Sequence, residues 1–362
     1  MKNKSLITIL LTVLMSMIDA NAFARDVIFF GAKNDDGVTI YYNLINDETE
    51  LEVRRSSDYS GNIVIPEEVT YKNKTLKVTN IESHAFWQCS GLTSIVIPNS
   101  VTTIGEMAFW ECKGLTSVTI GNSVTSIGVS AFNQCSALTS VIIPNSVTFI
   151  GPGAFFECSN LNSVTLGNSL MIIGECAFGY CGNLTSIKIP SSVTTMRMGA
   201  FSFTGLTSVV IPEGVSIIGP AAFGGCGSMT SVTIPNSVTT IEVQAFSLSD
   251  NLTSVISLIE NPFEIGGREP DSSGLSTFSL GVYDNATLYV PVGTIEKYKA
   301  TEGWKDFKNI EEFDPSGIKK VTNDNVNSSI VFDLNGKRLS NLRKGINIIR
   351  QSDGTTKKVI VK

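Results

Sequence analysis

The strongest constraint on the fold is an Ala-Phe pair that returns at almost constant spacing. The pairs begin at residues 85, 108, 131, 154, 177, 200, 222 and 245, so the period is 23 residues with one step of 22. The flanking residues repeat too, as in LTSIVIPNSVTTIGEMAFWEC at 92–112 and LTSVIIPNSVTFIGPGAFFEC at 138–158. A unit this short cannot bury its apolar face alone. The sequence therefore predicts a solenoid in which each turn covers the next.

Each unit contains a short β-strand whose inward side chains follow from alternation. In the stretch L-x-x-[IV]-x-[IV]-P, Ile95 and Ile97 are two residues apart and therefore share one face. The proline that follows cannot donate to a sheet, and Asn-Ser then supplies a turn. A second extended piece ends at Ile104, and in most units a glycine comes next, where we expect a positive φ or a close backbone approach. We predict a mainly β fold with short helical or irregular returns.

The first 24 residues have the features of a secretory signal peptide. Lys2 and Lys4 precede an apolar stretch from Leu6 to Ile18, and Ala22-Phe23-Ala24 forms a small-x-small cleavage site. No later segment is long and apolar enough to cross a bilayer. The net charge of −6 disfavours nucleic acids and anionic membranes as partners. We expect an exported chain that binds no nucleic acid and does not insert into a membrane.

Six of the seven cysteines stand at one place in the repeat. They are Cys89, Cys112, Cys135, Cys158, Cys181 and Cys226. Thr204 and Ser249 replace cysteine in two units, and Cys176 lies outside the column. Because equivalent residues of stacked turns form a ladder, we interpret these thiols as small inward residues. Two alternatives stay open, namely disulfides between adjacent turns, which export permits, and a metal or redox role.

The complete pattern L-x-x-[IV]-x-[IV]-P-x-x-[IV]-x-x-I-G-x-x-A-F-x-x-C resembles the repeat of the BspA-like family of bacterial surface leucine-rich-repeat proteins. The resemblance implies a right-handed leucine-rich-repeat solenoid over residues 81–256. It also implies an N-terminal cap at 25–80, where Ile63 and Ile65 imitate the strand, and a C-terminal cap at 257–313. In that second cap we expect a strand and a short helix from about Thr294 to Ala300. Caps are physically required, because a bare terminal turn exposes its core and its unpaired edge.

The composition changes after a linker that follows residue 313. The tail IVFDLNGKRLSNLRKGINIIRQSDGTTKKVIVK has two alternating apolar stretches around Asn335-Gly336 and a strand that begins at Gly345. It is similar to the small C-terminal β-domain of type IX secretion cargo, which implies an export and surface-attachment signal within residues 314–362. The alternative is a small β-module without a sorting function.

The sequence offers no catalytic constellation. His84 is the only histidine, so it has no second histidine ligand, and no serine or cysteine stands in an obvious nucleophile context. The glycine-rich stretch at 223–227 follows the repeat pattern and does not lead from a strand into a helix. We expect no enzyme activity, no cofactor and no metal site.

Two sets of repeated positions are candidate binding surfaces. Outward strand positions form a serine column that includes Ser94, Ser117, Ser140, Ser163, Ser186, Ser208, Ser231 and Ser254. Beside it runs a mixed column of Val96, Thr119, Ile142, Thr165, Lys188, Val210, Thr233 and Ile256. The second set consists of aromatic residues just after the repeated Phe, namely Trp87, Trp110, Phe156, Tyr180 and Phe203. Both sets also have a structural interpretation. The strand columns are then an ordinary exposed sheet, and the aromatic rings lean over the next turn and pack against it.

A long surface of equivalent positions favours binding over catalysis. The resemblance implies an adhesin-like protein at the cell surface or secreted, with a host or bacterial surface protein or a glycan as its partner. The alternative is a periplasmic or envelope scaffold without an external ligand. An enzyme or enzyme accessory module is the third hypothesis. The sequence identifies neither the partner nor the oligomeric state.

Overall fold

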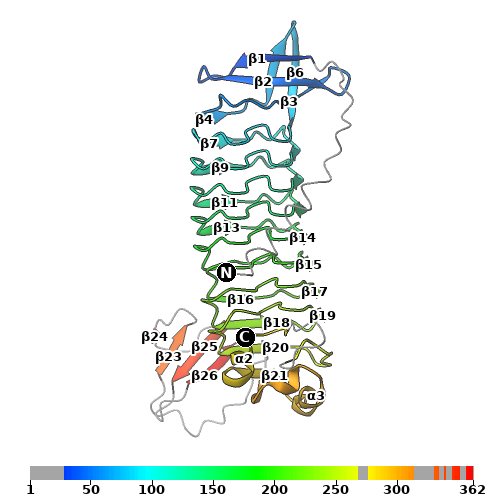
Figure 1. Ribbon diagram of the computed structural model, residues 1–362, viewed down its shortest axis with the longest axis vertical. Coiled ribbons are helices and arrows are strands. Elements are labelled where there is room, and N and C mark those ends of the chain that lie inside the picture. The colour runs from blue at the N-terminus through cyan, green and yellow to red at the C-terminus, as the bar shows by residue number, and fades with distance from the viewer. Residues whose placement is uncertain are drawn as a thin grey trace.

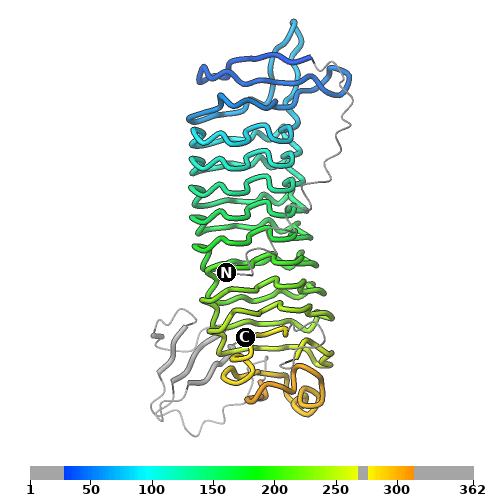
Figure 2. The backbone as a smooth tube through the Cα atoms, in the orientation of Figure 1, coloured from blue at the N-terminus to red at the C-terminus, as the bar shows by residue number. Residues whose placement is uncertain are grey.

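The computed structural model describes residues 28–267 and 276–313, together with the backbone of four strands between residues 330 and 361. Figure 1 shows a tall stack of similar turns with short strands at both edges of most turns. The smooth trace in Figure 2 shows the successive turns lying one below another along the long axis. The signal peptide predicted at residues 1–24 lies outside the described residues. The expected mainly β solenoid with a period of about 23 residues is confirmed.

The largest sheet runs along one edge of the stack and is called here the first sheet. It begins with antiparallel strands of the N-terminal region and continues as a parallel ladder with one two-residue strand per turn. In pairing order its strands are β1 (Phe29–Lys33), β2 (Thr39–Ile45), β3 (Glu50–Val53), β6 (Lys74–Ile81), β8 (Thr103–Ile104), β10 (Ser126–Ile127), β12 (Phe149–Ile150), β14 (Ile172–Ile173), β15 (Thr195–Met196), β17 (Ile217–Ile218) and β19 (Thr240–Ile241), and β5 (Glu68–Tyr71) pairs with β6.

The strands predicted from the L-x-x-[IV]-x-[IV]-P stretch form two further parallel sheets. The second sheet contains β4 (Gly61–Val64), β7 (Leu92–Val96), β9 (Ser117–Thr119), β11 (Ser140–Ile142) and β13 (Ser163–Thr165). The third sheet contains β16 (Ser208–Val210), β18 (Ser231–Ile234), β20 (Ser254–Ser257), β21 (Thr287–Pro291) and β22 (Asn309–Phe313). Residues 186–188 are extended but form no strand, and they separate the two sheets close to the single 22-residue step.

The returns that contain the Ala-Phe pairs are turns, with no helix between residues 82 and 257. Each return bends through two left-handed residues, such as Met107 and Glu111, whose φ angles are 52° and 56°. Backbone hydrogen bonds then join each return to the next one, as from Phe109 N to the carbonyl oxygen of Ala131 at 2.7 Å. Besides the strand ladders along the two edges, the returns therefore form a further backbone hydrogen-bonded ladder along the stack. The side of the stack that the returns form is called here the return side.

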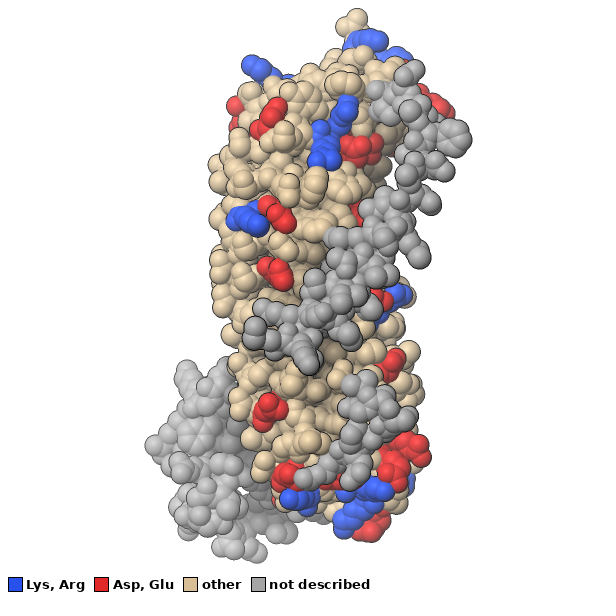
Figure 3. All heavy atoms as spheres, viewed as in Figure 1, with Lys and Arg blue, Asp and Glu red and all other residues tan. Residues whose placement is uncertain are grey.

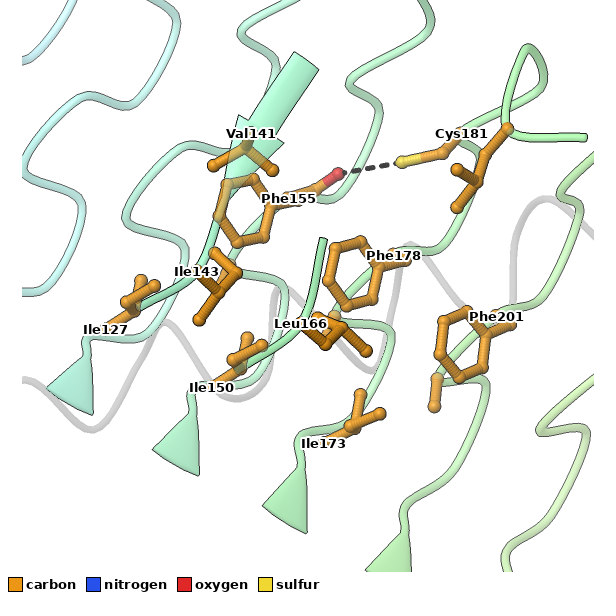
Figure 4. Packing of buried hydrophobic residues seen from close by; sticks show 14 of the residues in the cluster. Ile127, Val141, Ile143, Ile150, Phe155, Leu166, Ile173, Phe178, Cys181 and Phe201 are labelled. Carbon is orange, nitrogen blue, oxygen red and sulfur yellow. Dashed lines mark hydrogen bonds between the residues drawn. The ribbon is translucent and has the colours of Figure 1, made fainter. Parts of the chain in front are cut away.

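The core is a column of stacked phenylalanine rings lined by aliphatic side chains of both strand edges (Figure 4). Phe109 and Phe132 are fully buried, and their ring centroids lie 4.8 Å apart with planes only 2° from parallel. Tyr59 packs on the first ring of the column at 4.5 Å, and Phe278 packs on the last at 5.1 Å. Aromatic residues of the terminal regions thus continue the column at each end.

The glycine that follows the inward isoleucine in most turns is explained by close backbone approach. A Cβ atom on Gly128 would lie 2.7 Å from the carbonyl carbon of Gly105 in the preceding turn. Neither glycine has a φ angle in the left-handed region. Of the two sequence-based explanations, crowding between turns is therefore the correct one.

The C-terminal region supplies the helices of the described chain. They are α2 (Leu280–Asn285), α3 (Ile295–Ala300) and the 3-10 helix η2 (Trp304–Asp306). Thr294 is the N-cap of α3, which confirms the helix expected from about Thr294 to Ala300. Trp304 and Tyr298 are fully buried, and the Tyr298 hydroxyl donates to the carbonyl oxygen of Ile259 at 2.8 Å.

The tail forms a separate four-stranded antiparallel sheet. Its strands are β23 (Ile330–Asp333), β24 (Arg338–Leu339), β25 (Gly345–Arg350) and β26 (Thr356–Val361), in the order β24-β23-β25-β26. β23 and β24 flank Asn335-Gly336, and β25 begins at Gly345, as the sequence predicts. The small C-terminal β segment is confirmed, whereas its role as a sorting signal stays a prediction.

Candidate binding surfaces

The outer side of the second and third sheets between Thr93 and Ile256, called the serine face, presents the predicted columns in register. Ser94 pairs with Ser117, and Ser140 pairs with both Ser117 and Ser163. In the third sheet Ser208, Ser231 and Ser254 continue the same pattern. Ser117, Ser140, Ser163, Ser186 and Ser208 are exposed, whereas Ser94 is half-buried. The structure therefore brings the predicted serines together as one row along the stack.

Hydroxyl groups on the serine face fall into two groups. The threonines one position earlier bond back to the preceding turn, as Thr116 Oγ1 donates to the carbonyl oxygen of Thr93 at 3.0 Å. Ser94 donates to Asn62 Oδ1 at 2.8 Å. The hydroxyls of Ser117, Ser140 and Ser163 have no hydrogen-bond partner within the part of the chain that the structure describes. The threonine row thus serves the stack, and the serine row is available to solvent or a ligand.

Aliphatic side chains accompany the serine row in the neighbouring column. Ile142 is 68% exposed and Val210 is 66% exposed, although both are β-branched apolar residues. Lys188 is exposed on the same face and has no ion-pair partner among the described residues. Ile256 was expected to point outward with this column, but it is only 6% exposed, so that prediction is wrong at the C-terminal end.

The predicted aromatic residues lie on the return side and form two separate groups. Trp87 and Trp110 are half-buried in the first two returns, and the Arg55 guanidinium lies 4.5 Å from the centroid of the Trp87 ring. Phe156, Tyr180 and Phe203 form the second group, with centroid distances of 5.3 Å and 4.5 Å between successive rings. The fully buried Asn133 occupies the return between the groups. The structure therefore does not unite the five aromatics in one patch.

Two of these rings occupy space above the next return. A Cβ atom on Gly179 would lie 3.1 Å from Phe156 Cδ2, and one on Gly225 would lie 2.6 Å from Phe203 Cδ1. Phe156 is only 8% exposed. This geometry favours the packing interpretation for Phe156 and Phe203. A contact role for Trp87, Trp110 and Tyr180 stays a prediction.

The cysteine column is structural, and all seven cysteines are free. Cys181 Sγ donates to the carbonyl oxygen of Phe155 in the preceding turn at 3.2 Å, as Figure 4 shows. Ser249 takes the place of a cysteine and donates in the same way to Phe223 at 3.0 Å. Burial raises the pKa of the Cys181 thiol to about 12, so the thiol stays protonated and able to donate. This geometry confirms the inward interpretation and gives no support to disulfides.

Other reactive groups do not assemble into a catalytic site. His84 is half-buried with a left-handed φ of 64°, and its ring meets Trp87 edge-on at 5.8 Å. Cys176 lies apart from the column, and burial raises its pKa to about 11. Within the described ranges no group of three or more His, Cys, Asp and Glu side chains could hold a metal ion.

The sequence reasoning missed an apolar interruption on the outer side of the first sheet. Most turns carry Thr or Ser there, but Phe149 and Ile172 pair in register, and Met171 is 50% exposed. Ile217 lies in the same column and is 37% exposed. The signal was present in the repeats as VTFI and LMII where other units have VTTI or VTSI. These apolar side chains replace the Thr or Ser that most other turns carry at the same positions.

Basic side chains are sparse along the middle of the stack. On the face shown in Figure 3, most Lys and Arg side chains lie near the two ends. The serine face has three outward columns, namely the mostly threonine positions just before the serines, the serine column and the mixed column. Lys188 is the only charged residue in these three columns. Among the described residues no helix is long and apolar enough to cross a membrane.

These features define a capped, parallel β-solenoid of the leucine-rich-repeat class with exposed repeated columns. A family model described as the BspA type leucine rich repeat region matches residues 79–204 and 195–266 in 6 copies. Together these matches cover more than half of the 362 residues. The chain therefore belongs to the BspA-type leucine-rich-repeat family.

Solved structures with similar folds come from several bacteria. A leucine-rich cell surface protein from Faecalibacterium prausnitzii is 24% identical, has a TM-score of 0.53, and aligns over 78% of this chain and 94% of its own. A leucine-rich repeat protein from Bacteroides ovatus is 22% identical with a TM-score of 0.44, over 76% of this chain and 98% of its own. The pneumococcal vaccine antigen PcpA is 16% identical with a TM-score of 0.45, over 78% and 98%. Among proteins with curated functions, none matches the chain significantly.

Proposed function

We propose that the protein is an exported, non-enzymatic binding protein that acts at the cell surface as an adhesin-like molecule. Its ligand is a protein or a glycan, held by weak contacts that repeat along the solenoid. Membership of the BspA-type family supports a binding role, and one structural relative is described as a cell surface protein. The predicted signal peptide supports export.

The row of unused serine hydroxyls is the observation that carries the proposal. Every turn must satisfy its own backbone and pack its own core, and the threonine and cysteine ladders do this. The exposed hydroxyls of Ser117, Ser140 and Ser163 take part in neither task. Equivalent groups at equal spacing give many weak contacts with one ligand, and their combined avidity exceeds each single affinity.

Protease shaving of intact cells tests the surface location. Cells that produce the full chain are compared with cells that produce a version ending at Asp314, and cells and medium are fractionated. We expect protease to remove the full chain from intact cells and the shortened chain to remain inside. A reporter fused to residues 314–362 behind the same signal peptide is the matched control and should also reach the surface.

One result would contradict the proposal, and a second would contradict only the role of the tail. If protease reaches neither the full chain nor the shortened one, the protein lies within the envelope and a scaffold role replaces adhesion. If both versions are equally exposed, the surface location stands but the tail is not the sorting signal.

A further inference from the structure

We propose that the serine face between Ser117 and Val210 binds an uncharged, extended polysaccharide that runs along the solenoid axis. The inference rests on the proposed function, because it specifies the ligand class of the same surface protein. It follows from four properties of this face, namely free hydroxyls, regular spacing, exposed aliphatic side chains and near absence of charge.

The free hydroxyls provide the polar part of the recognition. A serine hydroxyl both donates and accepts hydrogen bonds, so it is matched by another hydroxyl or an acetamido group, which have the same capacity. Ser117, Ser140 and Ser163 are exposed, and their hydroxyls have no partner among the described residues. Polysaccharides present such groups on every sugar unit.

The spacing of the hydroxyls suits a polymer with its own repeat. Ser140 pairs in register with Ser117 on one side and with Ser163 on the other. Neighbouring parallel strands lie roughly 4.8 Å apart, so the row offers one hydroxyl at each such step along the axis. An extended glycan offers equivalent groups at each sugar unit, whereas a folded protein surface has no such period.

The neighbouring column provides the apolar part. Ile142 and Val210 lie two residues after Ser140 and Ser208 on the same strands, and both are about two-thirds exposed, at 68% and 66%. Sugar rings have apolar C–H faces beside their hydroxyl edges. A row of hydroxyls next to exposed aliphatic side chains matches this alternation of polar and apolar surface.

The charge of the face decides between ligand classes. Lys188 is the only charged residue of its three outward columns. Anionic polymers and nucleic acids require several cations along the contact, and typical protein surfaces are rich in both signs of charge. A nearly uncharged face of this length is therefore best matched by a neutral polymer.

The test measures binding of the full mature chain to insoluble polysaccharides. Microcrystalline cellulose, chitin and particulate β-1,3-glucan are the neutral probes, and cross-linked polygalacturonate and collagen-coated beads are the anionic and protein probes. We expect saturable binding to at least one neutral probe, with little change when the salt concentration rises about tenfold, because screening acts only on charges.

Variants locate the contact on the serine face. A triple variant with Ser117→Ala, Ser140→Ala and Ser163→Ala should bind the neutral probe at least tenfold more weakly. The matched control with Thr103→Ala, Ser126→Ala and Thr195→Ala removes three outward hydroxyls from the first sheet and should bind like the parent. Both variants should unfold at the temperature of the parent.

Several outcomes would overturn the inference. They are absence of binding to every neutral probe, binding only to polygalacturonate or collagen, and undiminished binding by the serine triple variant. Protease shaving separates this failure from failure of the proposed function. A chain that is exposed on cells but binds no neutral probe refutes the glycan ligand alone, whereas a chain that binds the probe but is protected in cells refutes the surface role alone.

Discussion

The serine face and the return side come from the same repeated units, yet they use their polar groups differently. On the return side, thiols such as Cys181 donate to the preceding turn and backbone groups bond to the next one. On the serine face, the hydroxyls of Ser117, Ser140 and Ser163 have no partner in the described chain. The return-side column satisfies its own polar groups within the stack, whereas the exposed serine hydroxyls are left to solvent or to the ligand that we propose.

The largest expected effect is a loss of stability at high pH, caused by the buried thiols of the cysteine column. Burial raises the pKa of Cys181 to about 12 and also raises the pKa of Cys135 and Cys158. Thiols of the unfolded chain ionise near pH 8.5, so above that pH the unfolded state binds fewer protons and the folded state loses stability as the pH rises towards 12. Each such thiol removes about 1.4 kcal/mol per pH unit in this window.

Denaturant unfolding at pH values of about 7, 9 and 10 measures this loss. The variant with Cys135→Ser and Cys158→Ser is the matched control, because Ser249 shows that serine fits the column and donates to the same carbonyl position. Its free energy of unfolding should fall less steeply with pH. Equal stability of the parent chain at about pH 7 and pH 10 would contradict the buried, protonated column.

The phenylalanine column should show the largest effect of a single substitution. Phe132 is fully buried and stacks between Phe109 and Phe155 at centroid distances of 4.8 Å and 5.2 Å. Phe132→Ala should therefore lower the free energy of unfolding by about 3–5 kcal/mol, because neighbouring rings held by their own turns cannot fill the cavity. Chemical denaturation provides the value, and a cost near zero would refute the inward position of the Ala-Phe column.

The tryptophan pair distinguishes packing from contact on the return side. Trp87 and Trp110 are half-buried, and both indole Nε1 atoms are buried without a partner among the described residues. Trp87→Ala combined with Trp110→Ala should lower the free energy of unfolding by about 2 kcal/mol, less than full burial would give, and leave ligand binding unchanged. Loss of binding at an unchanged melting temperature would move the binding surface to the return side.

The smallest expected effect concerns backbone strain in the returns. Gln134 has a left-handed φ of 58°, and the equivalent residue four turns later is Gly225, with a φ of 74°. Gln134→Gly should raise the free energy of unfolding by about 0.5–1 kcal/mol, because glycine adopts this conformation without a Cβ clash. Thr119→Gly in strand β9 is the control and should lower it. A destabilised Gln134→Gly variant would contradict the strain argument.

Much of the fold could be predicted because a repeat fixes the same contacts many times. The inward Ile95 and Ile97, the Phe column and the inward cysteines all follow from alternation and period, and each is buried. For Gly128 the sequence left two explanations open, a positive φ and a close backbone approach, because glycine permits both. The structure shows the close approach. Local chemistry at a repeated position therefore predicts packing well.

Other features depend on context that the period does not contain. The returns use left-handed residues as different as Met107, Glu111 and Gln134, so no residue type marks them. The break at residues 186–188 falls in a unit that keeps the repeat pattern, so the sequence does not mark it. For the candidate site, the sequence placed the serines in one row, but only the structure shows that Ser94 bonds to Asn62 while Ser117 is free.

Adhesion of whole cells tests the central claim most directly. Cells display the full chain, the serine triple variant (S117A, S140A, S163A) or the double tryptophan variant at equal surface density, and attached cells are counted on polysaccharide-coated and protein-coated surfaces. The account predicts attachment to a neutral polysaccharide that is lost with the serine variant and kept with the tryptophan variant. Attachment that survives loss of the serines, or that disappears only with the tryptophans, would contradict it.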